Sequence, residues 1–199
     1  MQALKTSPNL PTPPREELDE LTLARAKRGD RVAFGALVRY YQRPVFALLS
    51  RILLATGRRD LVEDLAQETF VRALRAIATF GDDGRNQLSS WLLTIATRVA
   101  LDALKRRVIP TQPLGELDDI LPGPRRADDE LDRRTLREAI GAAIETLPVS
   151  YRAAFLLREV HGFDYDAIAE ALGVDLGTVK SRLSRARTAL RAALEGVYP

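Results

Sequence analysis

Residues 164–194 read DYDAIAEALGVDLGTVKSRLSRARTALRAAL, and this stretch decides the fold of the C-terminal part of the chain. Asp164 is a residue type that caps helix N-termini, and Gly173 is the residue type that most often ends a helix in the left-handed conformation. Asp175 follows closely and can cap a second helix. Because two helices joined by a tight glycine-containing turn form a helix-turn-helix, the stretch predicts that motif.

The second of these helices has an apolar face and a basic face. Its apolar residues are spaced four, three and four apart, so they share one face and are expected to pack inward; they are Val179, Leu183, Ala186 and Leu190. The opposite face carries five cationic residues and two serines: Lys180, Arg182, Arg185, Arg187, Arg191, Ser181 and Ser184. Cationic side chains pair with phosphates and guanine edges, which predicts a recognition helix for the DNA major groove. The alternative is an ordinary surface helix with a solvated basic face.

Composition limits the function classes. The 199 residues are 46% hydrophobic and 29% charged, typical of a globular protein of one or two domains. No apolar run approaches the roughly 20 residues of a membrane span, so we expect a cytoplasmic protein. The formal net charge of +3 indicates nucleic-acid binding only where positive charges cluster.

The chain has no cysteine and one histidine, which excludes disulfides, thiolate zinc sites and cysteine nucleophiles. No phosphate-binding glycine loop or nucleophile-histidine arrangement is present either. We therefore expect no enzyme activity, cofactor, metal or small-molecule substrate. His161 lies beside Gly162, where a loop or packing histidine is far more common than a ligand.

Upstream, the apolar spacing predicts further helices and no convincing strand. Asp30 can cap a helix with apolar residues from Phe34 to Tyr41, and Pro44 fits the first turn of a separate helix that ends near Gly57. The pair Asp60 and Glu63 resembles a capping box that opens a helix reaching about residue 80. Another helix is expected from about residue 88 to residue 107, with a basic end.

The amino-acid composition changes at residue 110, where prolines, glycines and acidic residues replace the helical pattern. Helical spacing resumes near residue 131, breaks at Pro148 and continues from residue 151 to 160. We predict an all-α protein of two small helical domains joined by a flexible linker. The expected segments are a flexible tail with four prolines (1–15), a first domain (16–109), an acidic proline-rich linker (110–130) and a second domain (131–199).

Three stretches carry a family resemblance. Residues 147–187, LPVSYRAAFLLREVHGFDYDAIAEALGVDLGTVKSRLSRAR, resemble region 4 of extracytoplasmic-function (ECF) sigma factors of the sigma-70 family, and GTVKSRLSRAR is the most specific part. Residues 60–80, DLVEDLAQETFVRALRAIATF, resemble region 2.2, and residues 90–107, SWLLTIATRVALDALKRR, resemble regions 2.3 and 2.4. The resemblance implies a region 2 helical bundle followed by a region 4 helix-turn-helix domain.

The resemblance also implies a function and partners. It suggests an RNA polymerase sigma factor that directs core polymerase to minus-35 and minus-10 promoter elements and assists promoter melting, without covalent chemistry. In the family, region 2 binds the clamp helices of the largest polymerase subunit, and region 4 binds the minus-35 element and the flap of the second-largest subunit. An anti-sigma factor is a further expected partner.

Residue by residue, the resemblance implies three interfaces. The core polymerase interface would use Asp60, Asp64, Gln67 and Glu68, of which the three acids lie four apart and form one acidic stripe. The minus-35 interface would use Lys180, Ser181, Arg182, Ser184, Arg185 and Arg187. Without the resemblance, an acidic stripe of this kind is most often a solvated helix face.

The minus-10 interface would use Arg98, Asp102, Lys105 and Arg106, with the loop from residue 81 to residue 89 forming a pocket for flipped bases. Two positions depart from the family pattern: Arg98 stands where members often carry asparagine, and Leu88 where they often carry an aromatic residue. Trp91 could serve as a stacking platform, but its place on the apolar stripe with Ile95 favours core packing.

A stand-alone helix-turn-helix regulator is the alternative reading of the same residues. Residues 16–107 would then be an effector or dimerisation domain, and a dimer would bind two half-sites about one helical turn apart.

Overall fold

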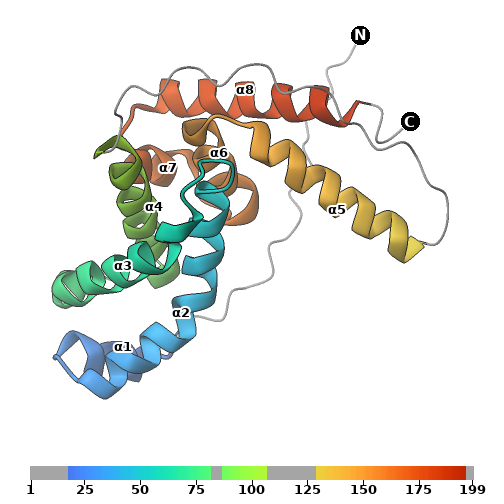
Figure 1. Cartoon of the computed structure of the whole chain (residues 1–199). Coiled ribbons are helices and arrows are strands. Elements are labelled where there is room, and N and C mark those ends of the chain that lie inside the picture. Colours follow the sequence, from blue (N-terminus) through green and yellow to red (C-terminus); the bar gives the residue numbers. More distant parts are fainter. Residues whose placement is uncertain (1–17, 82–86, 107–128, 196–199) are drawn as a thin grey trace, which may run out of the picture.

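The computed structural model describes residues 18–81, 87–106 and 129–195, and side chains in the last range from residue 138 onward. Eight α-helices in these ranges make up two groups (Figure 1). The N-terminal group is α1 (Glu20–Lys27), α2 (Arg31–Ile52), α3 (Val62–Ala76) and α4 (Leu88–Arg106). The C-terminal group is α5 (Asp129–Thr146), α6 (Val149–Phe155), α7 (Tyr165–Leu172) and α8 (Leu176–Leu194). The described residues contain no β-strand, as the all-α prediction requires.

Two expected segments lie largely outside the described residues. The proline-containing tail covers residues 1–15, and the acidic linker covers residues 110–130, of which the structure describes only the backbone of the last two, at the start of α5. No helix in the described part of the chain is both long and apolar enough to cross a membrane.

Aspartate caps begin the first two helices. The Asp30 carboxylate accepts hydrogen bonds from the backbone N–H groups of Val32 and Ala33, at 2.9 and 3.1 Å, which confirms the predicted start of α2. Asp19 caps α1 in the same way through the N–H of Thr22. Helix α1 was not predicted, because its eight residues are too few for a clear apolar period.

The prediction of separate helices on either side of Pro44 was wrong. Helix α2 is continuous from Arg31 to Ile52, with Pro44 inside it. Interior proline removes one helical hydrogen bond, a cost that tertiary packing can offset. Leu37, Val45 and Leu48 on both sides of the proline are fully buried, so the apolar face of α2 is held in place along its length.

The predicted capping box at Asp60 and Glu63 was also wrong. Residues Arg59–Leu61 form a 3₁₀ turn, and α3 begins at Val62 without a side-chain cap. The Asp60 carboxylate instead lies 3.5 Å from the Arg58 guanidinium, where it forms an exposed ion pair.

The helix-turn-helix prediction is confirmed by the geometry of its caps. The Asp164 carboxylate accepts from the N–H of Ala167 at 2.7 Å, and Asp175 accepts from the N–H of Thr178 at 2.8 Å. Gly173 ends α7 with φ of +63°, the left-handed conformation expected of it. The apolar face of α8 is buried as predicted: Val179, Leu183, Ala186 and Leu190 are all at most 7% exposed.

The two helical groups share one hydrophobic core. A continuous cluster of buried residues runs from α2, α3 and α4 into α6, α7 and α8. Figure 1 shows α7 against α4, and α6 behind the end of α2. A smaller cluster, of Ala143, Leu147, Ala186 and Leu190, joins α5 to α8. The structure therefore brings together two domains that the sequence places on either side of a linker.

Arg152 of α6 joins the two groups through backbone carbonyls. Its side chain is buried, and it donates to the carbonyls of Ile52 and Leu54 at the end of α2. It also donates to the carbonyls of Glu145 and Leu147, both at 2.8 Å. Burial lowers the pKa of Arg152, but an arginine side chain stays protonated at neutral pH. The cation thus satisfies carbonyls at one helix end of each group, where the helix dipole favours positive charge.

Candidate nucleic-acid and protein interfaces

Helix α8 presents the predicted basic face to solvent. Lys180, Ser181, Ser184, Arg185 and Arg187 are exposed, and Arg182 is half-buried on one flank. The serines lie between the cations on the outward side, so the backbone of α8 is free of bulky side chains there. A surface of this shape can enter a major groove and place guanidinium groups near base edges.

Two arginines of this face are held by neighbouring side chains. Arg187 donates to the Glu159 carboxylate at 2.8 Å, and Arg185 donates to the Tyr151 hydroxyl at 3.0 Å. These hydrogen bonds raise the pKa of both guanidinium groups above their ordinary value. Lys180 and Arg182 form no ion pair with any described residue. The four cations of the predicted set therefore divide into two that are pre-positioned and two that are open to phosphate.

The start of α8 is fixed by a double cap. Asp175 accepts from both the backbone N–H and the hydroxyl of Thr178, at 2.8 and 2.7 Å. The two Thr178 hydrogen bonds lower the pKa of Asp175 below its ordinary value, so it is ionised at neutral pH. The cap holds the first turn of α8, which precedes Lys180 directly, in one conformation.

Helix α4 carries the four predicted minus-10 residues on one face. From Arg98 to Arg106 they follow one another at spacings of four, three and one residue. Arg98, Lys105 and Arg106 are exposed, and Asp102 is half-buried. Arg98, however, donates to the Glu170 carbonyl of α7 at 2.7 Å, and it lies 3.5 Å from the Glu170 carboxylate. The contact joins α4 to the first helix of the helix-turn-helix. It occupies one of the four side chains that were assigned to the minus-10 interface from the sequence.

The residues around the predicted base pocket are partly described. Residues 82–86 of the expected loop lie outside the described ranges. Leu88 is buried in the first turn of α4, so its side chain is not available to stack on a base. Trp91 is half-buried and packs against Phe80, with ring centroids 5.1 Å apart, as core packing predicts.

His161 is also a packing residue, as expected. It is buried at the end of the π-helical turn Leu156–Val160. No group of His, Asp and Glu side chains within the described ranges has the arrangement of a metal site.

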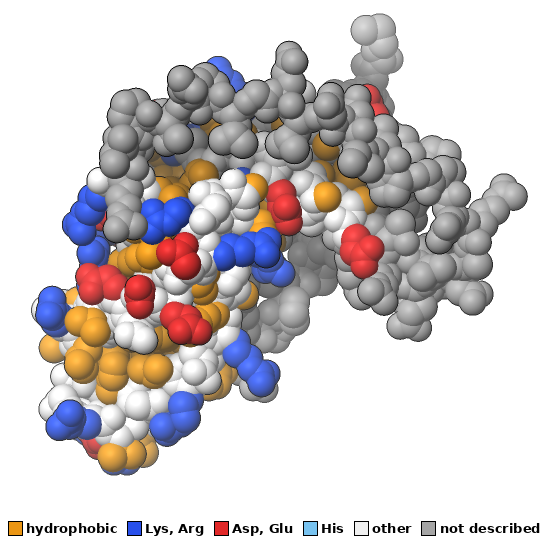
Figure 2. Space-filling model, in the orientation of Figure 1, with side chains coloured by type: hydrophobic (Ala, Val, Ile, Leu, Met, Phe, Trp, Pro, Cys, Tyr) orange, Lys and Arg blue, Asp and Glu red, His pale blue; other side chains and the backbone are white. Residues whose placement is uncertain are grey.

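Helix α3 carries the predicted acidic set on an exposed face. Asp64 and Gln67 are exposed, and Glu68 is half-buried and pairs with Arg72 four residues later at 2.7 Å. Asp60 precedes the helix, in the 3₁₀ turn Arg59–Leu61. Figure 2 shows acidic side chains gathered over α3, with exposed hydrophobic side chains beside them.

Two of the exposed apolar residues extend this face, and sequence reasoning missed both as surface residues. Val71 is 41% exposed and Leu74 is 50% exposed. They follow Gln67 at spacings of four and three, so the three side chains share one line on the helix. The signal that could have found them is the phase of the buried residues Leu65, Ala66 and Phe70, which leaves Val71 and Leu74 on the opposite side.

Two family models match this chain in the order expected. The model described as "Sigma-70 region 2" matches residues 37–108, and the model described as "Sigma-70, region 4" matches residues 137–190. The first match covers α3, α4 and most of α2, and the second covers the end of α5 through most of α8.

Three curated relatives are similar along nearly their whole length. The RNA polymerase sigma-H factor of Pseudomonas aeruginosa is 34% identical over 90% of this chain and 95% of the relative. The ECF RNA polymerase sigma-E factor of Escherichia coli is 33% identical over 86% of this chain and 92% of the relative. The ECF RNA polymerase sigma factor SigW of Bacillus subtilis is 31% identical over 86% of this chain and 94% of the relative.

Two solved structures share the fold. The sigma factor RpoE of Bartonella quintana, in complex with the anti-sigma factor NepR, aligns with a TM-score of 0.54 and 25% identity. The alignment covers 79% of this chain and 98% of that one. CnrH, solved with the cytosolic domain of CnrY, aligns with a TM-score of 0.58 and 24% identity over 88% and 96% of the two chains.

Proposed function

This chain belongs to the sigma-70 family as an ECF RNA polymerase sigma factor, and we propose that α3 binds core polymerase while α4 and α8 bind promoter DNA. The single observation that carries the proposal is the separation of surface charge. The acidic face lies on α3, and the basic face of α8 lies in the other helical group. A stand-alone regulator is not favoured, because residues 37–108 match sigma region 2 rather than an effector domain.

The α3 face suits a protein partner better than DNA. Asp64 and Glu68 repel phosphate, and the exposed side chains of Val71 and Leu74 add apolar area that water solvates poorly. Protein interfaces combine an apolar centre with a polar rim, which is the composition found here. A basic helical surface, such as the family's clamp helices, would complement the acidic residues.

The α8 face suits duplex DNA at the minus-35 element. Lys180 and Arg182 are open to phosphate, and Arg185 and Arg187 are anchored where a helix seated in the groove would bring them to bases. Arg98, Asp102, Lys105 and Arg106 of α4 would form the minus-10 surface. We expect no catalytic role for the chain itself, since binding and strand opening require no covalent step.

The packed arrangement must open for both promoter elements to be bound together. Elements centred near minus 35 and minus 10 are about 25 base pairs apart, or roughly 85 Å along the duplex. Helices α4 and α7 are in direct contact, so the two DNA surfaces are much closer than that. Residues 107–128 could span at most about 75 Å when extended, and α4 and α8, 19 residues each and about 28 Å long, add to that reach, so together they can cover the required distance. We therefore propose that polymerase binding separates them.

A protein that favours the packed arrangement would inhibit initiation. The sigma factor RpoE of Bartonella quintana, which shares the fold, was solved in complex with the anti-sigma factor NepR, and we infer a partner of the anti-sigma class for this chain. Such a partner would act by stabilising contacts such as that between Arg98 and Glu170.

Reconstituted transcription tests the proposal. The purified chain with core polymerase should yield transcripts that begin at defined promoters, read by sequencing of run-off products. The double variant Asp64→Lys/Glu68→Lys should lower the affinity for core polymerase at least about tenfold, because it reverses two of the three acidic charges on α3. The matched control Glu20→Lys/Asp166→Lys changes the net charge equally at exposed positions away from α3, and should assemble normally. Equal affinities of the two double variants would contradict the proposed polymerase surface.

A further inference from the structure

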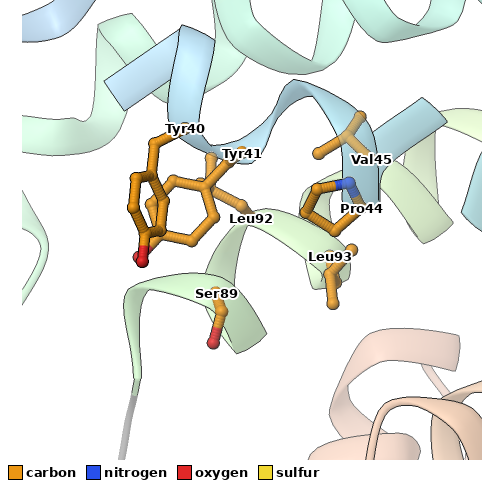
Figure 3. A pocket seen from close by; sticks show the side chains of 7 residues that line it. All are labelled: Tyr40, Tyr41, Pro44, Val45, Ser89, Leu92 and Leu93. Carbon is orange, nitrogen blue, oxygen red and sulfur yellow. The ribbon is translucent and has the colours of Figure 1, made fainter. Parts of the chain in front are cut away.

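An apolar pocket of about 290 Å³ opens between α2 and α4 (Figure 3). Its walls are Tyr40, Tyr41, Pro44 and Val45 from α2, and Leu92 and Leu93 from α4; Ser89 completes the lining. The two tyrosine rings meet edge to face, with centroids 4.9 Å apart. Small-molecule sites usually begin at about 300 Å³, so this pocket is sized for one or two side chains of a peptide.

The chain enters the described fold at the rim of this pocket. The backbone N–H of Leu18 donates to the Tyr41 hydroxyl at 3.2 Å, and the Leu18 side chain packs against the core. The residues before Leu18 therefore start within reach of the pocket walls. Pro14 is four residues away, so it can lie at most about 14 Å along the chain from Leu18.

The sequence before Leu18 has the pattern of a polyproline II ligand. Residues 8–14 read PNLPTPP, with Pro8, Pro11 and Pro14 at intervals of three. A polyproline II helix has three residues per turn, so these three rings share one edge, about 9 Å apart. Proline-rich segments with two prolines separated by two residues bind aromatic-lined grooves, because the preformed helix loses little entropy on binding.

We propose that residues 8–14 of this chain bind in the α2–α4 pocket as a polyproline II segment. The pocket supplies the aromatic walls, the segment supplies a ridge of proline rings, and Leu18 ties the two together. Tethering raises the local concentration of the segment to the millimolar range, so even weak contacts keep the pocket filled. The segment is then an internal ligand of α4, which any external molecule that uses the pocket must displace.

Disulfide trapping in the full chain tests the proposal, because the chain has no cysteine of its own. The variant Thr12→Cys/Ser89→Cys places one thiol in the segment, with its prolines intact, and one in the pocket lining. Its disulfide should form at least about tenfold faster than that of the control Thr12→Cys/Gln42→Cys. Gln42 is exposed on the same helix as Tyr41 but does not line the pocket. Equal trapping rates would overturn the proposal.

Replacement of the prolines makes the test specific. Adding Pro8→Ala/Pro11→Ala/Pro14→Ala to the trapping pair should reduce its rate to that of the control, and an unchanged rate would overturn the proposal. A synthetic peptide of residues 5–17, added in excess to the unaltered trapping pair, should slow the reaction severalfold by competition, while the same peptide with three alanines should not. Failure of the proline peptide to compete would count against the pocket as its site.

The reactivity of the thiol in Ser89→Cys also distinguishes residues 8–14 from other occupants of the pocket. A contrary result is that a single-stranded minus-10 oligonucleotide protects the thiol of Ser89→Cys from a soluble reagent while the proline replacements leave the reactivity of this thiol unchanged. In that case the pocket holds a base, and the proposal is wrong. If only added core polymerase protects the thiol, the pocket belongs to that partner, and the proposal is likewise wrong. Greater reactivity of the thiol on proline replacement alone supports the internal segment.

Discussion

The two surfaces assigned to DNA differ in how open they are. On α8 the exposed cations face solvent, and the two that are anchored, Arg185 and Arg187, are held by side chains of their own helical group. On α4 one of the three predicted cations, Arg98, is held by Glu170 of the other group. A side chain held within its own domain is pre-positioned for a ligand, whereas one held across domains is withheld until the domains separate. Arginine is therefore pre-positioned for a ligand on α8 and withheld from a ligand on α4.

The difference predicts how the free chain behaves. Its proposed minus-35 surface is presented in the packed arrangement, and its proposed minus-10 surface is partly covered. The packed arrangement depends on the shared core and on Arg152, which donates to carbonyls in both groups. The following changes break or sharpen this comparison.

The largest expected effect comes from Arg152→Met. The change leaves four carbonyls without their donor, two in each group, and should lower the free energy of unfolding by about 3 kcal/mol. Urea denaturation followed by circular dichroism measures it. The control Arg158→Met removes one hydrogen bond, to the Phe163 carbonyl within the C-terminal group, and should cost about 1 kcal/mol. Equal losses would show that the hydrogen bonds of Arg152 across the two groups add nothing to stability.

A change on the open surface should act on DNA binding and leave the fold intact. Arg185→Ala in the holoenzyme should weaken binding to a promoter duplex about tenfold, since a base contact is worth roughly 1–3 kcal/mol. Fluorescence anisotropy across a series of salt concentrations measures it. Arg191→Ala, an exposed position outside the predicted set, should have a smaller effect. A larger loss for Arg191→Ala would move the recognition surface toward the end of α8.

The cap of α8 tests whether the open surface is held rigid. Asp175→Ala removes both hydrogen bonds to Thr178 and should lower the melting temperature by a few degrees at pH 7. Because the pKa of Asp175 is lowered in the folded state, its carboxylate stabilises the fold above the ordinary value of 3.8, and this contribution is lost as pH falls through the lowered pKa. The difference between variant and parent should therefore shrink from pH 5 toward pH 2.5. Asp166→Ala, exposed in α7, is the control, and a constant difference would contradict the assignment.

The smallest effect is expected at the contact that covers α4. Glu170→Ala removes the exposed carboxylate near Arg98 but keeps the carbonyl that accepts its hydrogen bond. Exposed ion pairs contribute roughly 0.2–1 kcal/mol, so the free chain should bind a minus-10 single strand about two- to fivefold more tightly. Isothermal titration with the oligonucleotide measures it, and Asp166→Ala is again the control. Weaker binding by Glu170→Ala would mean that Glu170 belongs to the DNA surface itself.

The helix-turn-helix was the most predictable part of the fold. Its caps at Asp164 and Asp175, its glycine exit and the inward face of α8 all follow from local chemistry, and the structure confirms each. The sequence was less reliable where tertiary packing overrides local preference. Pro44 lies inside α2 because the buried residues on both sides hold the helix together, and Asp60 pairs with Arg58 instead of capping α3.

In the candidate site, too, local sequence predicted some features and tertiary packing decided others. Exposure of the cations on α8 and of the acids on α3 could be predicted, because each set lies opposite a buried stripe. The contacts Arg98 to Glu170 and Arg152 to Ile52 could not, because they join residues 72 and 100 positions apart with no local pattern. Exposure of Val71 and Leu74 on α3 was not predicted, because apolar residues on a helix usually pack inward.

By itself the sequence determined the helix-turn-helix, its caps and the charge that the faces of α3 and α8 carry, because these depend on residues a few positions apart. Only the tertiary structure decided that the two helical groups share a core, that α7 covers part of α4, and that an aromatic pocket lies where the chain enters the fold. Such features arise when distant apolar surfaces find the arrangement that removes most area from water, and no short stretch of sequence specifies that arrangement.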